Sequence, residues 1–233
     1  MALDVDSADK ALDLAKLLSG EVAGFKVGLE SINSAGFGIL DALRERVGAD
    51  AKIFYDCKFL DIPNTVAGAA RAAARRGVWM FNIHASGGSA MLKAAVVGAE
   101  EGAAQAGIKK PLVIAVSVLT SISPEILRSE LGVTRPLIEH VVSLARLAQD
   151  SGCDGLVASP HEIAAIRAAC GPDFLLVIPG VRPTGAALGD QKRVMTPADA
   201  LREGADYLVI GRPITADADP LASARRINAE TAG

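Results

Sequence analysis

The sequence predicts an α/β fold, a single (β/α)8 TIM barrel that spans residues 1–233. Short runs rich in Val, Ile and Leu alternate with longer segments of helical periodicity along the chain. The apolar runs do not alternate cleanly with polar residues, which is typical of parallel strands buried on both faces. No segment has the composition of a linker, and the length suits one barrel, so we expect one domain.

Eight apolar runs are the expected strands. They cover residues 1–5, 24–28, 51–56, 80–84, 111–119, 155–159, 174–180 and 207–212. A doubly wound open sheet is the alternative arrangement of such elements. That fold usually has a Gly-x-Gly-x-x-Gly turn after its first strand, whereas the turn here is LDVDSAD, without glycine. The missing glycines favour the barrel.

Helix start and stop signals lie between these strands. Ser7 is placed as an N-cap for a segment that stops at Gly20, and Pro63 stands near the first position of a helix that ends at Gly77. Further segments with helical spacing are 134–152, 159–171, 196–205 and 219–230. A strand followed by a helix is the repeating unit of the barrel.

The composition excludes several classes of protein. The formal net charge is −3 and there is no basic stripe, so we expect no nucleic-acid partner. The three cysteines have no Cys-x-x-Cys spacing, which is typical of reduced thiols in a cytosolic protein. We see no signal peptide and no apolar stretch of roughly 18 residues, and therefore expect a soluble cytoplasmic protein without a membrane partner.

Polar residues and glycines gather at the ends of the expected strands, whereas the strand bodies are apolar. Active sites of barrels lie at the carboxyl ends of the strands, so these residues are the candidates for chemistry. The strand ends and the residues just beyond them supply Asp4, Lys26, Asp56, Lys58, Asp61, Asn82, His84, Ser117, Thr120, Pro179, Gly180, Arg182, Gly211 and Arg212.

The stretch FYDCKFLDIPNT at 54–65 concentrates charge at the end of the third strand. Residues two apart in a strand point the same way, so Asp56 and Lys58 are expected to share one face, with Cys57 on the other. Carboxylates at Asp56 and Asp61 would keep Lys58 protonated and make it a proton donor. Two interpretations are open at this point, a catalytic group and a structural ion-pair cluster that closes the barrel.

The loops after the last two strands predict a phosphate site. Barrels often bind phosphate there, and glycine lets backbone N–H groups approach an anion. The loop from Gly180 to Thr196 contains three polar handles, and Arg212 offers a bidentate guanidinium. A lid that closes over phosphate and a merely flexible loop are the two interpretations of this long segment. The polar handles are Arg182, Gln191 and Arg193.

We expect no metal site. His84, His140 and His161 are far apart in the sequence, and no His-Glu-x-x-His or His-x-His pair occurs. There is no Gly-x-Ser-x-Gly motif and no Walker-type loop either.

Six segments resemble the signature segments of the orotidine 5′-phosphate decarboxylase family. They are DCKFLDIPNT, FKVGLE, NIHASGG, IPGVRP, GDQKRVMTP and VIGRPI. The resemblance runs from ALDVD to the last strand loop in the expected order. It implies an enzyme that decarboxylates orotidine 5′-phosphate to UMP in pyrimidine biosynthesis. It also implies a homodimer with shared active sites and no cofactor or metal.

The resemblance assigns roles to individual residues. Lys58 would protonate C6 of the product and, with Lys26, Asp56 and Asp61, would form the catalytic array. Asp4 and Lys26 would bind the ribose hydroxyls, and Asp61 would reach into the partner's site. The further substrate-binding residues would be Ile62, Thr65, Thr120, Arg182, Gln191, Gly211 and Arg212.

Two rival functions remain open from the sequence. The Asp-x-Lys-x-x-Asp core is shared with sister sugar-phosphate decarboxylases and hexulose-phosphate synthases, which hold Mg²⁺ with a glutamate on the second strand. This chain has Lys26 at that position, and Glu30 lies four residues further on. The second rival is a catalytically inactive barrel that binds a nucleotide.

Overall fold

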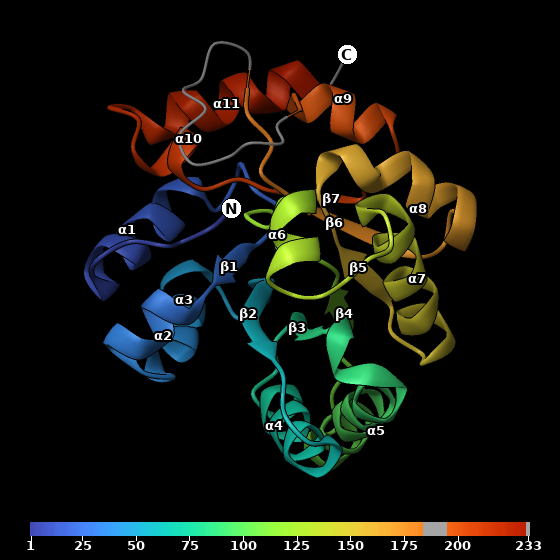
Figure 1. The fold of residues 1–233 in the computed structure, drawn as a ribbon. Coiled ribbons are helices and arrows are strands. Elements are labelled where there is room, and N and C mark those ends of the chain that lie inside the picture. Colours follow the sequence, from blue (N-terminus) through green and yellow to red (C-terminus); the bar gives the residue numbers. More distant parts are fainter. Residues whose placement is uncertain (184–194, 232–233) are drawn as a thin grey trace.

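Seven parallel strands form the centre of the computed structural model, which describes residues 1–183 and 195–231. They pair in the order of the sequence, from β1 to β7, and the sheet curves into a nearly closed barrel with helices around it (Figure 1). The strands are β1 Phe25–Val27, β2 Ile53–Phe59, β3 Met80–His84, β4 Leu112–Val116, β5 Gly155–Val157, β6 Leu175–Pro179 and β7 Tyr207–Val209.

Helices follow the strands in the described part of the chain. They are α1 Ala8–Leu18, α2 Leu29–Ala35, α3 Gly38–Val47, α4 Pro63–Arg75, α5 Gly88–Ala106, α6 Pro124–Ser129, α7 Leu137–Asp150, α8 Ile163–Cys170, α9 Pro197–Arg202, α10 Arg212–Thr215 and α11 Pro220–Thr231, with 3-10 turns η1 Ala85–Gly87 and η2 Pro160–Glu162. The helices α2, α3, α5, α6 and α10 were not among those predicted from the sequence.

The predicted helix starts are confirmed. The side chain of Ser7 caps α1 by accepting a hydrogen bond from the backbone N–H of Lys10 at 3.2 Å. Pro63 is the first residue of α4, where its missing N–H leaves no donor unpaired. The seven strand predictions from residue 24 onward are also confirmed, with bounds that differ by a few residues at most strands.

The predicted first strand at 1–5 is not a strand in the structure. Only an isolated bridge joins Ala2 to Lys26. The N–H of Ala2 donates to the carbonyl of Ile210 at 2.8 Å, and the N–H of Leu3 donates to that of Lys26 at 2.9 Å. The ladder stops there because the carbonyl of Leu3 accepts bonds from Val5 at 3.0 Å and from the Ser31 hydroxyl at 2.9 Å.

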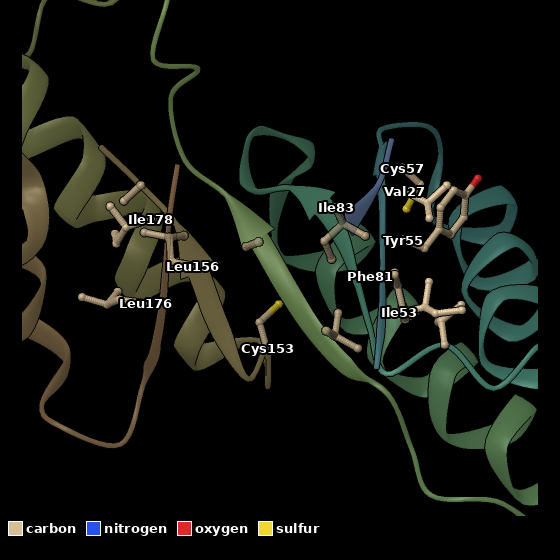
Figure 2. Packing of buried hydrophobic residues seen from close by; sticks show 14 of the residues in the cluster. Val27, Ile53, Tyr55, Cys57, Phe81, Ile83, Cys153, Leu156, Leu176 and Ile178 are labelled. Carbon is tan, nitrogen blue, oxygen red and sulfur yellow. The ribbon is translucent and has the colours of Figure 1, made fainter. Parts of the chain in front are cut away.

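Alternation along the strands sorts apolar side chains into two groups. Ile53, Tyr55 and Cys57 of β2 belong to the large cluster that includes the helices, and Figure 2 shows them near Phe81 and Ile83 of β3. The alternate residue Phe54 belongs to a second cluster inside the barrel. The other buried members of that inner cluster are Met80, Ile114 and Val177.

This inner layer decides where polar groups can lie. Asp56 and Asn82 follow Phe54 and Met80 by two residues and so take the same inward direction, one level closer to the carboxyl ends of the strands. Apolar residues therefore close the lower interior, and charged residues occupy the level above it.

Within the described residues, no helix is both long and apolar enough to cross a membrane. All three cysteines are free thiols.

Candidate active site

A cleft of about 450 Å³ opens at the carboxyl ends of the strands. It lies where the sequence analysis expected an active site, and eight of the predicted site residues line it. These eight are Asp4, Lys26, Asp56, Lys58, Thr120, Arg182, Gly211 and Arg212.

Lys26 of β1 links two carboxylates at the floor of this cleft. Its Nζ atom lies 2.9 and 3.0 Å from the two carboxylate oxygens of Asp4 and 2.9 Å from Oδ2 of Asp56. Burial opposes the charged form of Lys26, but attraction to Asp56 and then to Asp4 outweighs it and raises the pKa of Lys26. Lys26 therefore stays a fixed cation.

Asp56 bridges two lysines. Its Oδ1 atom lies 2.6 Å from Nζ of Lys58, while Oδ2 contacts Lys26. Burial of the carboxyl group works against ionisation, but Lys26, Lys58 and the hydrogen bonds to the group lower the pKa of Asp56 to about 2. The result is a continuous alternating series of four charges, from Asp4 through Lys26 and Asp56 to Lys58.

The backbone of β2 is irregular at this series. Tyr55 pairs with Phe81, and the next pair joins Phe59 to Ile83, so β2 advances further than β3 across the same interval. Lys58 has φ +48°, and it is the one non-glycine residue with positive φ in the described ranges. Such a backbone costs about 1–2 kcal/mol for an L-residue, and unusual backbone is common at functional sites.

Asn82 of β3 fixes this irregular backbone. It was one of the strand-end candidates in the sequence, but no role could be assigned to it there. Its Nδ2 donates to Oδ1 of Asp56 at 2.7 Å, and its Oδ1 accepts from the backbone N–H of Lys58 at 2.7 Å. The signal that could have found it is a polar residue two positions after Met80 on the inward face of an apolar strand.

Gly28 leaves room for the charge series. A Cβ atom at this position would lie 2.9 Å from Oδ1 of Asp4 and 3.1 Å from Nζ of Lys26. Any larger residue would therefore displace the Asp4–Lys26 ion pair. Glu30 also lines the cleft on this side and was not among the predicted site residues.

Two arginines also line the cleft. Arg182 follows β6 and Arg212 begins α10 just after β7. The backbone N–H of Arg182 donates to the carbonyl of Met195 at 2.9 Å, so the two described ends of the loop after β6 meet beside the cleft. Gln191 and Arg193, and most of the loop expected to act as a lid, lie outside the described residues.

Three predicted site residues do not line the cleft of their own chain. Asp61, Ile62 and Thr65 lie on an exposed segment from Leu60 to Thr65, after β2 and at the start of α4. Leu60 is 57% exposed and Ile62 is 67% exposed. A carboxylate oxygen of Asp61 accepts the N–H of Ile62 at 2.7 Å, which orients the start of the turn into α4.

His84 ends β3 near the charge series but does not line the cleft. Burial and then the charge of Lys58 lower its pKa, which favours a neutral ring. Among residues 1–183 and 195–231, no group of three or more His, Cys, Asp or Glu side chains could hold a metal ion.

The family model described as "Orotidine 5'-phosphate decarboxylase / HUMPS family" matches residues 1–227. The chain belongs to this family. The match covers nearly the whole chain, including every element that lines the cleft.

Curated members of the orotidine 5′-phosphate decarboxylase family are similar over almost their full lengths. A protein of that name from Moorella thermoacetica is 55% identical over 230 residues, which is 99% of this chain and 90% of the relative. One from Nostoc sp. is 53% identical over 99% of this chain and 95% of the relative. The crystal structure of orotidine 5′-phosphate decarboxylase from Lactobacillus acidophilus is 39% identical, with a TM-score of 0.85 over 100% of this chain and 97% of that one.

Proposed function

We propose that this chain decarboxylates orotidine 5′-phosphate to UMP, the pyrimidine-forming reaction named in its curated relatives. The observation that carries the proposal is the charge series Asp4–Lys26–Asp56–Lys58 in a cleft that also holds Arg182 and Arg212. A fixed cation can stabilise negative charge at the reacting carbon, and a phosphate site can supply binding energy away from it. Reactions that use both include few in which no electron sink is present in the substrate. Decarboxylation without an electron sink in the substrate is one of them.

Lys58 supplies the central chemistry in this proposal. The bond between C6 and the carboxylate carbon breaks, CO₂ leaves, and the electron pair stays on C6. The ammonium group of Lys58 stabilises the negative charge that develops there and then gives its proton to C6. Solvent returns a proton to Lys58, so the net reaction consumes one proton and needs no cofactor.

Asp56 and Lys26 keep this proton donor in place. The carboxylate of Asp56 contacts both lysines, so the Lys58 ammonium is aimed before substrate arrives. An array that is already ordered does not have to reorganise during the reaction, which is the main source of electrostatic catalysis. Asp4 and Lys26, at the opposite end of the series, would bind the ribose hydroxyls.

The phosphate of the substrate would bind where two arginines line the cleft. Arg182 and Arg212 supply guanidinium groups, and Gly211 leaves the backbone open to an anion. We assign Gln191 to the same task and Thr120 to the pyrimidine. Binding energy from this remote group can exclude water from C6 and raise the rate as well as the affinity.

A second copy of the chain would complete each site. The segment Leu60–Thr65 exposes two large apolar side chains beside Asp61. Burial of Leu60 and Ile62 against a partner would bring Asp61, Ile62 and Thr65 to the partner's cleft. We therefore propose a homodimer with shared active sites that works in the cytoplasm. We also propose that the chain is a single-domain barrel, in which the bridge from Ala2 to Lys26 and the bond from Ala2 to Ile210 take the place of an eighth strand.

Incubation of the purified protein with orotidine 5′-phosphate tests the reaction. UMP and CO₂ should form in equal amounts, and EDTA treatment should leave the rate unchanged. Loss of all activity in EDTA would instead indicate a metal-dependent sister reaction. Folded protein that binds the nucleotide but forms no UMP would show an inactive binding barrel.

A further inference from the structure

Asn82 joins the two residues on which the proposed chemistry depends. One end of its side-chain amide donates to Oδ1 of Asp56 at 2.7 Å, and the other accepts the backbone N–H of Lys58 at 2.7 Å. The same Asp56 oxygen contacts Nζ of Lys58 at 2.6 Å. Asn82 thus contacts the carboxylate and the main chain of an ion pair whose members are two residues apart.

Only one orientation of the Asn82 amide satisfies both partners. The Asp56 carboxylate accepts hydrogen bonds, so it needs the NH₂ group, and the Lys58 N–H donates, so it needs the carbonyl oxygen. No other residue type of this size presents one donor and one acceptor in this fixed geometry. A carboxylate in its place would face Asp56 with a second negative charge.

Asn82 stands at the point where the strand ladder is interrupted. β2 and β3 pair at Tyr55–Phe81 and again at Phe59–Ile83, and Lys58 lies in the irregular interval between them. The bond from Lys58 N–H to Asn82 takes the place of a backbone bond in this interval. It also holds the positive φ of Lys58, since an unpaired N–H here could relax toward the ordinary extended backbone.

The surroundings of Asn82 make these contacts rigid. The residue is 1% exposed, and its backbone carbonyl accepts a bond from the Cys57 thiol at 3.1 Å. Asn82 lines the cleft, but both ends of its amide are engaged by Asp56 and Lys58. Its effect on chemistry would therefore be indirect.

We infer that Asn82 is a positioning residue, which holds the Lys58 backbone and the Asp56 carboxylate so that the lysine ammonium points at C6. This inference rests on the proposed decarboxylation. It adds a requirement that the charged residues alone do not meet. A neutral amide must donate to the Asp56 carboxylate and accept from the Lys58 N–H at the strand irregularity.

Two substitutions at one position test the inference. Asn82→Asp keeps the shape and can still accept from Lys58 but places a second carboxylate beside Asp56. Asn82→Leu removes both contacts at similar volume. We expect each to lower kcat by about 100-fold, because small misplacement of a catalytic group has this scale of effect, while KM stays within about threefold. Affinity for UMP should be retained, since Arg182 and Arg212 are unchanged.

Ser117→Ala is the matched control. Ser117 was a strand-end candidate in the sequence, but the structure places it outside the cleft lining. It is buried just after β4, and its hydroxyl donates to the carbonyl of Val157 at 2.9 Å. Its removal should leave kcat within about twofold of the wild type. The inference would be overturned if the Asn82 variants lost UMP affinity by the same factor as kcat. It would also be overturned if Ser117→Ala lowered kcat as much as the Asn82 variants do.

The pH dependence gives a second readout. Asp56 faces Lys26 from β1, Lys58 from β2 and His84 from β3, and Lys26 in turn contacts Asp4. In Asn82→Leu the Asp56 carboxylate loses one donor, which raises the pKa of Asp56. The acid limb of the kcat profile should move to higher pH, a change that a general loss of folded protein does not produce.

Amide hydrogen exchange tests the same contact in the unmodified protein. The Lys58 N–H should exchange slowly because Asn82 accepts it, and exchange as fast as an exposed amide would overturn the inference. The wild-type protein must form UMP in the kinetic assay used for the Asn82 variants. If it does not, the proposed function fails, but the hydrogen-exchange result still decides whether Asn82 holds the Lys58 backbone.

Discussion

Asp56 and Lys58, two residues apart on β2, form an ion pair of 2.6 Å while Lys58 adopts φ +48°. Strand alternation alone would place the two side chains on one face, several ångströms apart. The irregularity between β2 and β3 turns the backbone so that the Lys58 ammonium folds back onto the Asp56 carboxylate. The geometry of the charge series therefore depends on the backbone as much as on the charges.

Lys58→Ala should remove nearly all turnover of orotidine 5′-phosphate and leave UMP binding intact. The substitution deletes the cation and the proposed proton donor, whereas Arg182 and Arg212 in the same cleft are unchanged. Steady-state kinetics and calorimetric titration with UMP measure the two effects.

Lys110→Ala is the control for this loss of charge. Lys110 pairs with Asp154 at 3.1 Å away from the cleft, so its kcat should stay within about twofold of the wild type. Near-normal turnover by Lys58→Ala would show that another group supplies the proton.

The contribution of Asp56 to stability should vanish in acid. Its pKa in the folded state is about 2, below the ordinary value of 3.8, so its stabilisation is fully present above about pH 4 and is lost as the pH falls toward 2. The free energy of unfolding of Asp56→Asn should be about 2 kcal/mol below that of the wild type near pH 5. This difference should shrink between pH 4 and pH 2. Denaturant unfolding across this range measures it.

Asp6→Asn serves as the surface control. Asp6 forms an exposed ion pair with Lys10 at 3.5 Å. Asp6→Asn should therefore lower the free energy of unfolding by less than about 0.5 kcal/mol. A deficit for Asp56→Asn that stays constant from pH 5 to pH 2 would contradict the ionised, paired state of Asp56.

Mixed dimers should regain activity if Asp61 serves the neighbouring subunit. When Lys58→Ala and Asp61→Ala subunits exchange, some heterodimers contain one cleft with both residues intact. Activity should therefore rise above that of either variant alone, and the rise should follow the rate of subunit exchange measured with labelled chains.

A second mixture controls for simple stabilisation by mixing. Lys58→Ala with Asp56→Ala leaves no intact cleft in any combination, because both residues serve their own chain. Equal recovery in the two mixtures, or none in the first despite exchange, would place Asp61 outside the partner's site.

Gly102→Ala should destabilise the protein where α5 crosses α4. A Cβ atom there would lie 2.4 Å from the carbonyl oxygen of Arg71 and 2.9 Å from Cβ of Ala74, so the helices must separate. We expect a loss of about 1–3 kcal/mol in the free energy of unfolding. Gly98, one turn earlier, approaches the carbonyl of Ala67 in the same way.

Gly68→Ala provides the opposite expectation in the same pair of helices. No atom lies within 4 Å of a Cβ at Gly68, so alanine should stabilise α4 by about 0.5–1 kcal/mol. Thermal unfolding of both variants checks the sign, and two changes of the same sign would argue against close packing as the cause.

Strand positions could be predicted from the sequence because buried parallel strands have few competing explanations. The helix α5 was harder, since Gly98 and Gly102 lower its intrinsic propensity and are present only because α4 packs so closely. The first strand was overestimated at 1–5, because a local bond between Val5 and Leu3 ends the ladder early. Helix packing and individual hydrogen bonds of this kind cannot be predicted from local composition.

The site shows the same division. Asp56 and Lys58 were predicted together from their spacing, and the structure brings them into contact. Asn82 could be placed at a strand end, but its role depends on the irregular pairing of β2 with β3, which no sequence spacing indicates. Asp61 lies close to Lys58 in sequence, yet the chain turns outward after Phe59 and leaves Asp61 exposed.

The bond from Ala2 to Ile210 joins residues that are almost the whole chain apart. During synthesis on the ribosome, the first residues emerge at once and can bond to Lys26, but their other edge must wait until β7 has been made. The ring closes only when the last strand arrives, and that strand leads directly into Gly211 and Arg212. A nascent chain therefore acquires Arg212 and its final ring contact in the same step, so an incomplete chain lacks part of the cleft lining.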